Sequence, residues 1–342
     1  MRFNNVVISD FAHYLPELVM TSDEIESRLA PLYNKLGLPE GRLELMTGIT
    51  ERRYWEPGTR PSALSTKAAN NLFEKGKIKK SDIDLVMHAS VCRDFLEPST
   101  AAVVHCDLGL KPEAMLFDLS NACLGVMSSM VVAANLIESG AIKHALIVSG
   151  ENGGPLLFQT IENLLNDDSI NRKNIKKYIA NLTIGSAAVA YTLSHKDHAE
   201  GAKLVGGISM ADTTANVLCQ GGGDTQALMM ETDSEELMKK GVVLAKETWK
   251  RTKAEISWSN EDIDFAIGHQ VGKAHETLTM EALGLTKTKT FKTYPFLGNT
   301  GSAALPVTLD LLNHEMKIEK GSKVALLGIG SGLNSIMLGV EW

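Results

Sequence analysis

The sequence lacks the features that mark several large classes of protein. Its only cysteines are Cys92, Cys106, Cys123 and Cys219, and their spacing fits neither a zinc site nor a disulfide framework. No apolar run approaches the roughly 20 residues that cross a bilayer, and the opening MRFNNVVISD lacks a signal-peptide pattern. The net charge of −7 argues against a nucleic-acid ligand. We therefore expect a cytoplasmic globular protein with free thiols and no metal ion.

Short aliphatic runs alternate along the chain with amphipathic segments of helical length. NNVVISDFA, DIDLVMHASV and HALIVSG are such runs. This alternation is typical of α/β proteins in which helices cover both faces of a parallel sheet. Thr21, followed three residues later by Glu24, predicts a capping box for a helix that runs through SDEIESRLAPLYNKLG.

Two strand patterns recur at one offset. DIDLVMHASV at 82–91 aligns with DIDFAIGHQV at 262–271, and HALIVSG at 144–150 aligns with VALLGIG at 324–330; 262 − 82 and 324 − 144 are both 180. The repeat predicts two structural copies, residues 1–196 and 197–342, each built as strand, loop, helix, strand. The alternative is chance similarity between buried strands. The polar stretch at 151–220 forms either insertions that roof a site or surface excursions.

Cys123 begins a largely apolar segment, SNACLGVMSSMVVAANLIESG, that we expect to be a helix. The first turn of a helix offers free backbone N–H groups and a partial positive charge. Both would favour the thiolate over the thiol and lower the pKa from its usual value of about 8.5. The same N–H groups could bind the oxyanion formed when a thiolate attacks a thioester. Cys123 is therefore the candidate nucleophile.

The predicted duplication supplies two partners from the second half. His269 ends the repeated strand, and Asn299 precedes the helix that corresponds to the Cys123 helix. A histidine can act as a base or a donor, and an asparagine can polarise a carbonyl. Each could instead be structural. A protease built on Cys, His and Asn is another possibility, but the residues around Cys123 lack the cysteine-protease signature.

The segments around Cys123, His269 and Asn299 resemble those of a known family. SNACLG, IGHQV and GNTGSAALPVTL resemble the Cys, His and Asn segments of β-ketoacyl-ACP synthase III and the wider thiolase superfamily, and TGITERR at 47–53 resembles their N-terminal signature. The resemblance implies the thiolase fold, a five-layered αβαβα arrangement of two duplicated halves. SVCRDFLEPSTA, NACLG and LLGIGSGLNSIMLGVEW are most similar to the OleA-type condensing enzymes of long-chain olefin biosynthesis.

That resemblance implies a non-decarboxylative Claisen condensation of two fatty acyl-CoA molecules to a 2-alkyl-3-keto acid, through an acyl-Cys123 intermediate. It implies a homodimer in which Glu97 enters the partner's site as the base that removes the α-proton. His269 and Asn299 would stabilise the enolate, and the N–H groups of Ser331 and Cys123 would form the oxyanion hole. Acyl-CoA would be substrate with no further cofactor, and downstream olefin-pathway enzymes would be partners.

Several alternatives remain open. The chain could be a decarboxylating synthase III that uses acyl-CoA and malonyl-ACP, a related acyltransferase, or an inactive partner subunit, although Cys123, His269 and Asn299 together argue against the last. Glu97 could be an ordinary loop carboxylate, and GIGSG at 328–332 could be a tight turn, although it is not a dinucleotide motif. No cysteine lies beyond Cys219 to serve as the second catalytic cysteine of a degradative thiolase.

Two binding features are also left open. The Trp and Arg that hold the CoA adenine in synthase III are not reproduced, because the equivalent positions are Arg42 and Met46. The segment 228–230, LMM, together with Met127 and Met130, could line a channel for the acyl chain or could belong to the core.

Overall fold

The computed structural model describes residues 1–222 and 228–342, in which nine strands form one sheet and two further pairs, β2 with β3 and β9 with β10, form small separate sheets. Short, fully buried segments such as Leu85–His88 form the parallel strands, because such strands are covered on both faces. The strands in sheet order are β11 (Phe265–Gly268), β12 (Lys323–Gly330), β13 (Asn334–Glu341), β8 (Ala202–Ala211), β1 (Val6–Tyr14), β7 (Ala187–His195), β6 (His144–Glu151), β4 (Leu85–His88) and β5 (Met115–Asp118).

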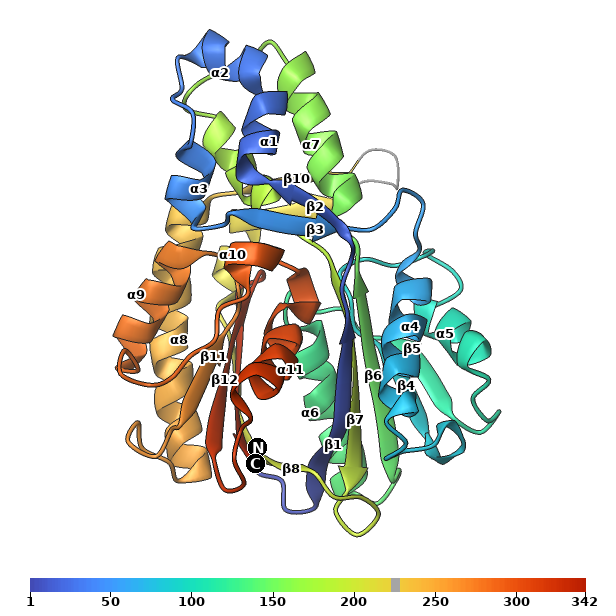
Figure 1. The fold of residues 1–342 in the computed structure, drawn as a ribbon. Helices are drawn as coiled ribbons and strands as arrows, with labels where there is room; N and C mark the ends of the chain where they lie inside the picture. Colours follow the sequence, from blue (N-terminus) through green and yellow to red (C-terminus); the bar gives the residue numbers. More distant parts are fainter. Residues whose placement is uncertain (223–227) are drawn as a thin grey trace.

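Helices cover this sheet in layers. Two helices, α6 (Gly125–Glu138) and α11 (Ala304–Met316), lie in the centre, between the part of the sheet around β6 and β7 and the part around β11 and β12 (Figure 1). On the outer faces lie α4 (Pro61–Glu74) and α5 (Thr100–Leu108) on one side, and α8 (Ser234–Ile256) and α9 (Lys273–Leu283) on the other. The succession is the five-layered αβαβα arrangement of the thiolase fold.

The same strand pairing occurs twice. β4 pairs in parallel with β6 as β11 does with β12, and β6 and β12 each pair antiparallel with the following strand, β7 or β13. The equivalent hydrogen bonds run from Asp84 N–H to His144 O and from Asp264 N–H to Lys323 O. Their offsets are 264 − 84 = 180 and 323 − 144 = 179, so the second strand of each pair is displaced by one residue from the ungapped sequence alignment. The halves meet where β1 pairs antiparallel with β8.

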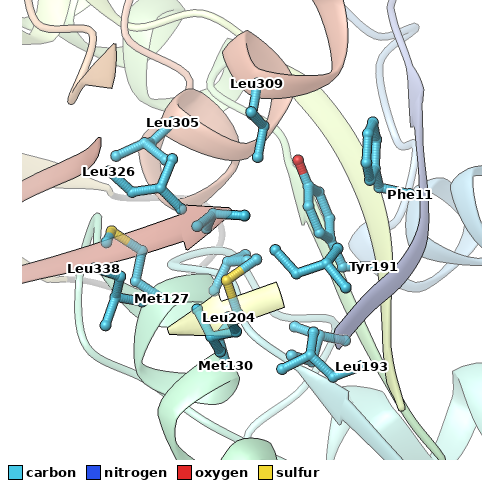
Figure 2. Packing of buried hydrophobic residues seen from close by; sticks show 14 of the residues in the cluster. Phe11, Met127, Met130, Tyr191, Leu193, Leu204, Leu305, Leu309, Leu326 and Leu338 are labelled. Atoms are coloured by element: carbon cyan, nitrogen blue, oxygen red, sulfur yellow. The ribbon is translucent and has the colours of Figure 1, made fainter. Parts of the chain in front are cut away.

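The main core fills the space between the two parts of the sheet. Met127 and Met130 of α6 pack with Leu305 and Leu309 of α11 (Figure 2). Tyr191 of β7, which is fully buried, donates its hydroxyl hydrogen to Pro306 O at 2.6 Å. Met127 and Met130 are thus plain core residues in this structure, and the apolar helix α6 owes its position to burial on both sides.

A smaller layer covers one end of the molecule. The Thr21 hydroxyl accepts from Glu24 N–H at 3.1 Å, and the Glu24 carboxylate accepts from Thr21 N–H at 2.7 Å, which confirms the predicted capping box. The expected single helix is wrong, because the chain turns at Leu29 and a second helix begins with a proline in its first turn. The elements here are α1 (Ser22–Arg28), α2 (Ala30–Leu36), α3 (Arg42–Thr47), α7 (Gly154–Asn166), α10 (Tyr294–Leu297), β2 (Leu18–Thr21), β3 (Glu51–Tyr54), β9 (Cys219–Gly222), β10 (Met229–Thr232) and η2 (Ile175–Thr183).

The stretch at 151–220 is only partly a roof. α7 and η2 lie in this end layer, but 187–195 and 202–211 are the central strands β7 and β8, so the expectation of an insertion is wrong for them. Of the polar segment CQGGGDTQ, residues 223–226 lie outside the described residues. Three short 3₁₀ turns complete the chain: η1 (Lys80–Asp82), η3 (Thr213–Leu218) and η4 (Gly301–Ala303).

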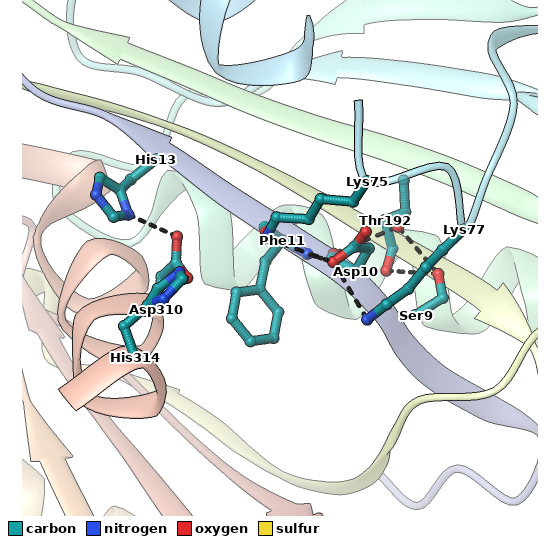
Figure 3. Close-up of polar contacts among 9 residues, drawn as sticks. All are labelled: Ser9, Asp10, Phe11, His13, Lys75, Lys77, Thr192, Asp310 and His314. Atoms are coloured by element: carbon teal, nitrogen blue, oxygen red, sulfur yellow. Dashed lines mark hydrogen bonds and ion pairs between the residues drawn. The ribbon is translucent and has the colours of Figure 1, made fainter. Parts of the chain in front are cut away.

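Buried acidic groups lie on both sides of β1 (Figure 3). Asp10 is 3.5 Å from Lys77 Nζ, and Asp310 of α11 accepts from His13 at 2.7 Å. Both carboxylates are buried, so each needs such a partner to offset its loss of hydration. These pairs join α11 and the segment that follows α4 to β1.

Candidate active site

Cys123 lies just before the central helix rather than in its first turn. Helix α6 begins at Gly125, with Leu124 as its N-cap residue. The preceding Ala122 has a φ of +45°, an uncommon conformation for a residue with a side chain. Cys123 thus follows a strained residue and keeps partial exposure to solvent. All four cysteines are free thiols in the structure.

The expected lowering of the thiol pKa is wrong for this structure. Desolvation by the surrounding protein, and then the nearby Glu151 and Cys219, raise the pKa of Cys123 to about 12. Proximity to the helix N-terminus does not outweigh burial beside a carboxylate. The protein without substrate therefore holds Cys123 as a neutral thiol.

A residue from the second half closes the N-terminus of α6. The Ser302 hydroxyl accepts a hydrogen bond from Val126 N–H at 2.9 Å and donates one to Ala89 O. Gly125 leaves room for this contact, because a Cβ there would lie 2.7 Å from Ala89 O and 2.8 Å from Ser302 Oγ. The loop that follows Asn299 is thereby fixed to the helix that follows Cys123.

The turn that carries Ser331 is fixed to the nucleophile segment by one side chain. Asn334 Nδ2 donates to Ser331 O and to Asn121 Oδ1, each at 3.1 Å. Immediately before this turn, a Cβ on Gly330 would lie 3.7 Å from Cys123 Cβ and 3.0 Å from Leu124 Cγ. The Gly-rich turn therefore passes directly beside Cys123, as an oxyanion-hole role for Ser331 requires.

Asn299 lies in an extended segment between α10 and η4, five residues before α11 begins. Its backbone N–H donates to Thr183 O and its carbonyl accepts from Gly185 N–H, each at 2.9 Å. The side-chain Oδ1 accepts from Gly301 N–H at 3.1 Å. Since the carboxamide oxygen is occupied, its N–H₂ group is left to donate to a substrate oxygen.

His269 directly follows β11 and donates its backbone N–H to Leu327 O on β12. It lies at the same carboxyl edge of the parallel strands as Gly330, the last residue of β12. The imidazole is 5% exposed, and burial followed by the neighbouring His275 lowers its pKa to about 3. Its Nδ1 has no hydrogen-bond partner among the described residues. His269 is therefore a neutral imidazole with a nitrogen free for another proton donor or acceptor.

Glu97 differs from Cys123 and His269 in that the structure places it on the surface. It is exposed, in the loop between β4 and α5, and no described contact joins it to Cys123 in the same chain. Its neighbours Phe95 and Leu96 are also exposed, Leu96 by 92%. A role at the site of its own protomer is thus not favoured by this arrangement.

The sequence patterns did not identify Glu151, Ser302 and Asn334. Their hydrogen bonds connect the segments around the expected site residues. Glu151 is the last residue of β6 and is 3% exposed. Its one available signal was an acidic residue directly after the buried run HALIVSG, where a carboxylate has no packing role. Ser302 and Asn334 each sit two or three residues from an expected site residue, and nothing in their spacing marked them.

The described residues contain a cavity but neither a metal-ligating cluster nor a membrane-spanning helix. A cavity of about 320 Å³ is lined in part by Met229 and Met230, and by Asn181 and Tyr178 of η2. No cluster of three or more metal-ligating side chains occurs in residues 1–222 and 228–342. Nor does any helix in that part of the chain have the length and apolar character needed to cross a membrane.

Comparison with known proteins identifies the family. The family model described as 3-oxoacyl-[acyl-carrier-protein (ACP)] synthase III matches residues 117–157. The family model for the C-terminal part of the same synthase matches residues 254–342. Proteins named acyl-CoA:acyl-CoA alkyltransferase are 38% identical in Shewanella oneidensis and 35% identical in Xanthomonas campestris pv. campestris, with 100% of both chains covered in each case. The chain belongs to the OleA family of acyl-CoA:acyl-CoA alkyltransferases.

Solved OleA structures agree with this assignment. A cysteine-to-serine variant of Xanthomonas campestris OleA with bound lauric acid and lauroyl-CoA has a TM-score of 0.94 at 33% identity, covering 99% of this chain and 100% of that one. Other structures of the same OleA carry substitutions of a glutamate or a histidine. The fold and the acyl-transferring class of the chain are those of the thiolase superfamily.

Proposed function

We propose that the protein joins two fatty acyl-CoA molecules head to head, forming a 2-alkyl-3-keto acid by Claisen condensation without decarboxylation. The observation that carries this proposal is the full-length relationship to acyl-CoA:acyl-CoA alkyltransferases. The contacts that hold the Asn299 loop and the Ser331 turn against the Cys123 segment support it. An OleA relative holds lauroyl-CoA, which supports long-chain acyl-CoA as the substrate here. We infer a cytoplasmic enzyme, and the keto acid would be passed to further enzymes.

In the first half-reaction Cys123 attacks the thioester of the first acyl-CoA. The thiol proton passes to a neutral base, and His269 would be this base because its imidazole is unprotonated. A C–S bond to Cys123 forms, the C–S bond to CoA breaks, and the CoA thiolate takes up the proton. The N–H groups of Cys123 and Ser331 would hold the oxyanion.

In the second half-reaction a carboxylate removes an α-proton from the second acyl-CoA. Glu97 of the partner subunit would be this base, and His269 and Asn299 would donate hydrogen bonds to the enolate oxygen. The α-carbon attacks the acyl-Cys123 carbonyl, and the thiolate of Cys123 leaves. Water then hydrolyses the remaining thioester, which yields the keto acid and a second CoA.

An exposed sheet edge supports the homodimer. β5 is the last strand of the sheet, and Met115 and Leu116 on it are 45% and 38% exposed. Unpaired edge strands with apolar side chains are unfavourable unless another chain covers them. Phe95 and Leu96, in the Glu97 loop, are also exposed apolar side chains. Pairing of two β5 strands would cover the edge and bring Glu97 to a neighbouring protomer.

A complementation experiment tests the crossed site. Glu97→Ala and Cys123→Ser would each abolish condensation of acyl-CoA. When the two variants are unfolded, mixed in equal amounts and refolded, half of the dimers should be mixed, and each mixed dimer should carry one intact site, so activity should return to about a quarter of normal. Recovery of no activity, with mixed dimers demonstrated by mass, would contradict a base supplied by the partner.

The nearest alternative is a decarboxylating synthase III, which the family description itself suggests. Supplying fatty acyl-CoA alone separates the two activities: release of CoA with formation of a keto acid supports condensation, whereas a strict need for malonyl-ACP supports the synthase. Finally, we propose residues 1–196 and 197–342 as the two halves. The repeated strand pairing supports this division, whose boundary falls between β7 and β8.

A further inference from the structure

Glu151 is a buried carboxylate that the proposed reaction does not use. Its Oε1 accepts hydrogen bonds from Val91 N–H and Ser302 N–H, each at 2.9 Å, and its Oε2 accepts from Cys92 N–H at 3.2 Å. Among the described ion pairs none includes Glu151, so backbone N–H groups and the Cys92 thiol solvate it without a cation, and burial raises its pKa above the usual value. Burying an acid without a cation is costly, and an apolar side chain could fill the same space. The acid is retained because an apolar side chain would leave the Val91, Cys92 and Ser302 N–H groups without an acceptor.

One set of contacts leads to Asn299. A Cβ on Gly301 would lie 3.0 Å from the Glu151 carboxyl carbon, so the loop passes directly against the carboxylate. Gly301 N–H is the donor that occupies Asn299 Oδ1, and Ser302 N–H is held by Glu151 itself. Glu151 thus fixes the backbone that orients the Asn299 carboxamide toward the substrate.

The other set of contacts leads to the Glu97 loop. Val91 and Cys92 are the third and fourth residues of the segment, 89–99, that connects β4 with α5 and carries Glu97. Holding both N–H groups fixes the direction in which this segment leaves the sheet. The remainder of the loop is anchored by Asp94, whose carboxylate accepts from Ser62 N–H at 2.9 Å.

Glu151 also acts on the nucleophile by charge. After desolvation it is the largest cause of the raised pKa of Cys123. The Glu151 carboxylate therefore contacts both the Asn299 loop and the Glu97 loop, and its charge disfavours the thiolate form of Cys123.

We propose that Glu151 is a positioning residue of the condensation, which holds the Asn299 loop and the Glu97 loop in place. This inference rests on the proposed function for its kinetic part, whereas its effect on the thiol can be measured in the protein alone. The second half-reaction depends on both loops, so it is the step that Glu151 supports most.

Glu151→Gln tests the inference, because it removes the charge while it preserves size and one acceptor oxygen. We expect condensation of a fatty acyl-CoA to fall by about tenfold or more in kcat, with little change in KM. Formation of acyl-Cys123, followed by mass in a single turnover, should be at least as fast as in the unchanged protein. The midpoint pH for alkylation of Cys123 by iodoacetamide should fall by about one unit.

Glu26→Gln is the matched control. Glu26 of α1 is also buried, at 5% exposure, and accepts from Gly41 N–H and Leu43 N–H at 2.6 Å each. Its substitution should lower stability without shifting the Cys123 titration. An unshifted titration in Glu151→Gln, or equal losses in acylation and condensation, overturns the inference. If the unchanged protein does not condense acyl-CoA, the proposed function fails, and the alkylation midpoint still decides whether Glu151 controls the thiol.

Discussion

Ser302 and Val126 are joined by a 2.9 Å hydrogen bond in which a hydroxyl from the second half of the chain accepts from the first turn of α6. Ser302 is 1% exposed, so neither its own hydroxyl nor the Val126 N–H can turn to water instead. The bond therefore connects the stability of the two halves to the geometry at Cys123.

Ser302→Ala should lower both stability and activity. The change leaves Val126 N–H and Ala89 O without their partner, which costs about 1–3 kcal/mol for a buried group. Urea unfolding measures the loss, and a single-turnover assay measures acylation of Cys123. Ser139→Ala, which removes an exposed hydroxyl at the end of α6, should change stability by less than about 0.5 kcal/mol. Equal effects of the two changes would contradict this role of Ser302.

Gly330→Ala should impair acylation more than folding. The new methyl group would lie 3.0 Å from Leu124 Cγ and 3.7 Å from Cys123 Cβ, so the nucleophile segment or the Ser331 turn must move. A displacement of this kind at a reacting group can cost about 100-fold in rate. Gly241→Ala is the control, since its methyl group would meet Ile329 at an ordinary 3.7 Å. Normal acylation by Gly330→Ala would show that the close approach is unimportant.

Stability should fall in acid because His269 is buried as a neutral imidazole. Its pKa is lowered from 6.5 to about 3, and burial lowers the pKa of His275 to about 4. Below pH 6.5 the unfolded chain binds protons at these positions that the folded chain does not, so the free energy of unfolding decreases as pH falls from 6.5 toward 3. Each group contributes a slope approaching about 1.4 kcal/mol per pH unit. The difference in the free energy of unfolding between pH 7.5 and pH 5 should be smaller in His269→Gln than in the unchanged protein.

Cys123 should react slowly with iodoacetamide in the absence of substrate. A pKa of about 12 leaves little thiolate at pH 8, and alkylation should become faster up to pH 10. Cys106 is exposed and provides an internal comparison, which we expect to react at least about tenfold faster at pH 8. Peptide mass mapping distinguishes the two sites. If Cys123 is labelled first, the resting enzyme carries an activated thiol.

The sequence was sufficient to predict the fold, since the repeat and the apolar periodicity are local patterns. It also marked the Asn299 and Ser331 segments, which contact the Cys123 segment through Ser302 and Gly330, while the roles of these residues stay predictions. The sequence was not sufficient to predict that the pKa of Cys123 is raised rather than lowered. A helix N-terminus is visible in SNACLG, but the opposing effect comes from Glu151, which is 28 residues away and reaches the thiol only through the packing of β6. The one-residue displacement between 180 and 179 was also hidden, because apolar strands align equally well in neighbouring registers.

The position of Glu97 has a consequence for assays at low enzyme concentration. Glu97 is exposed, and no described contact within its own chain joins it to Cys123. A separated protomer would still accept an acyl group on Cys123 but would lack a base for the second substrate. Serial dilution should therefore reduce specific activity and leave a stalled acyl-enzyme, whereas fusing two protomers in tandem should remove this dependence.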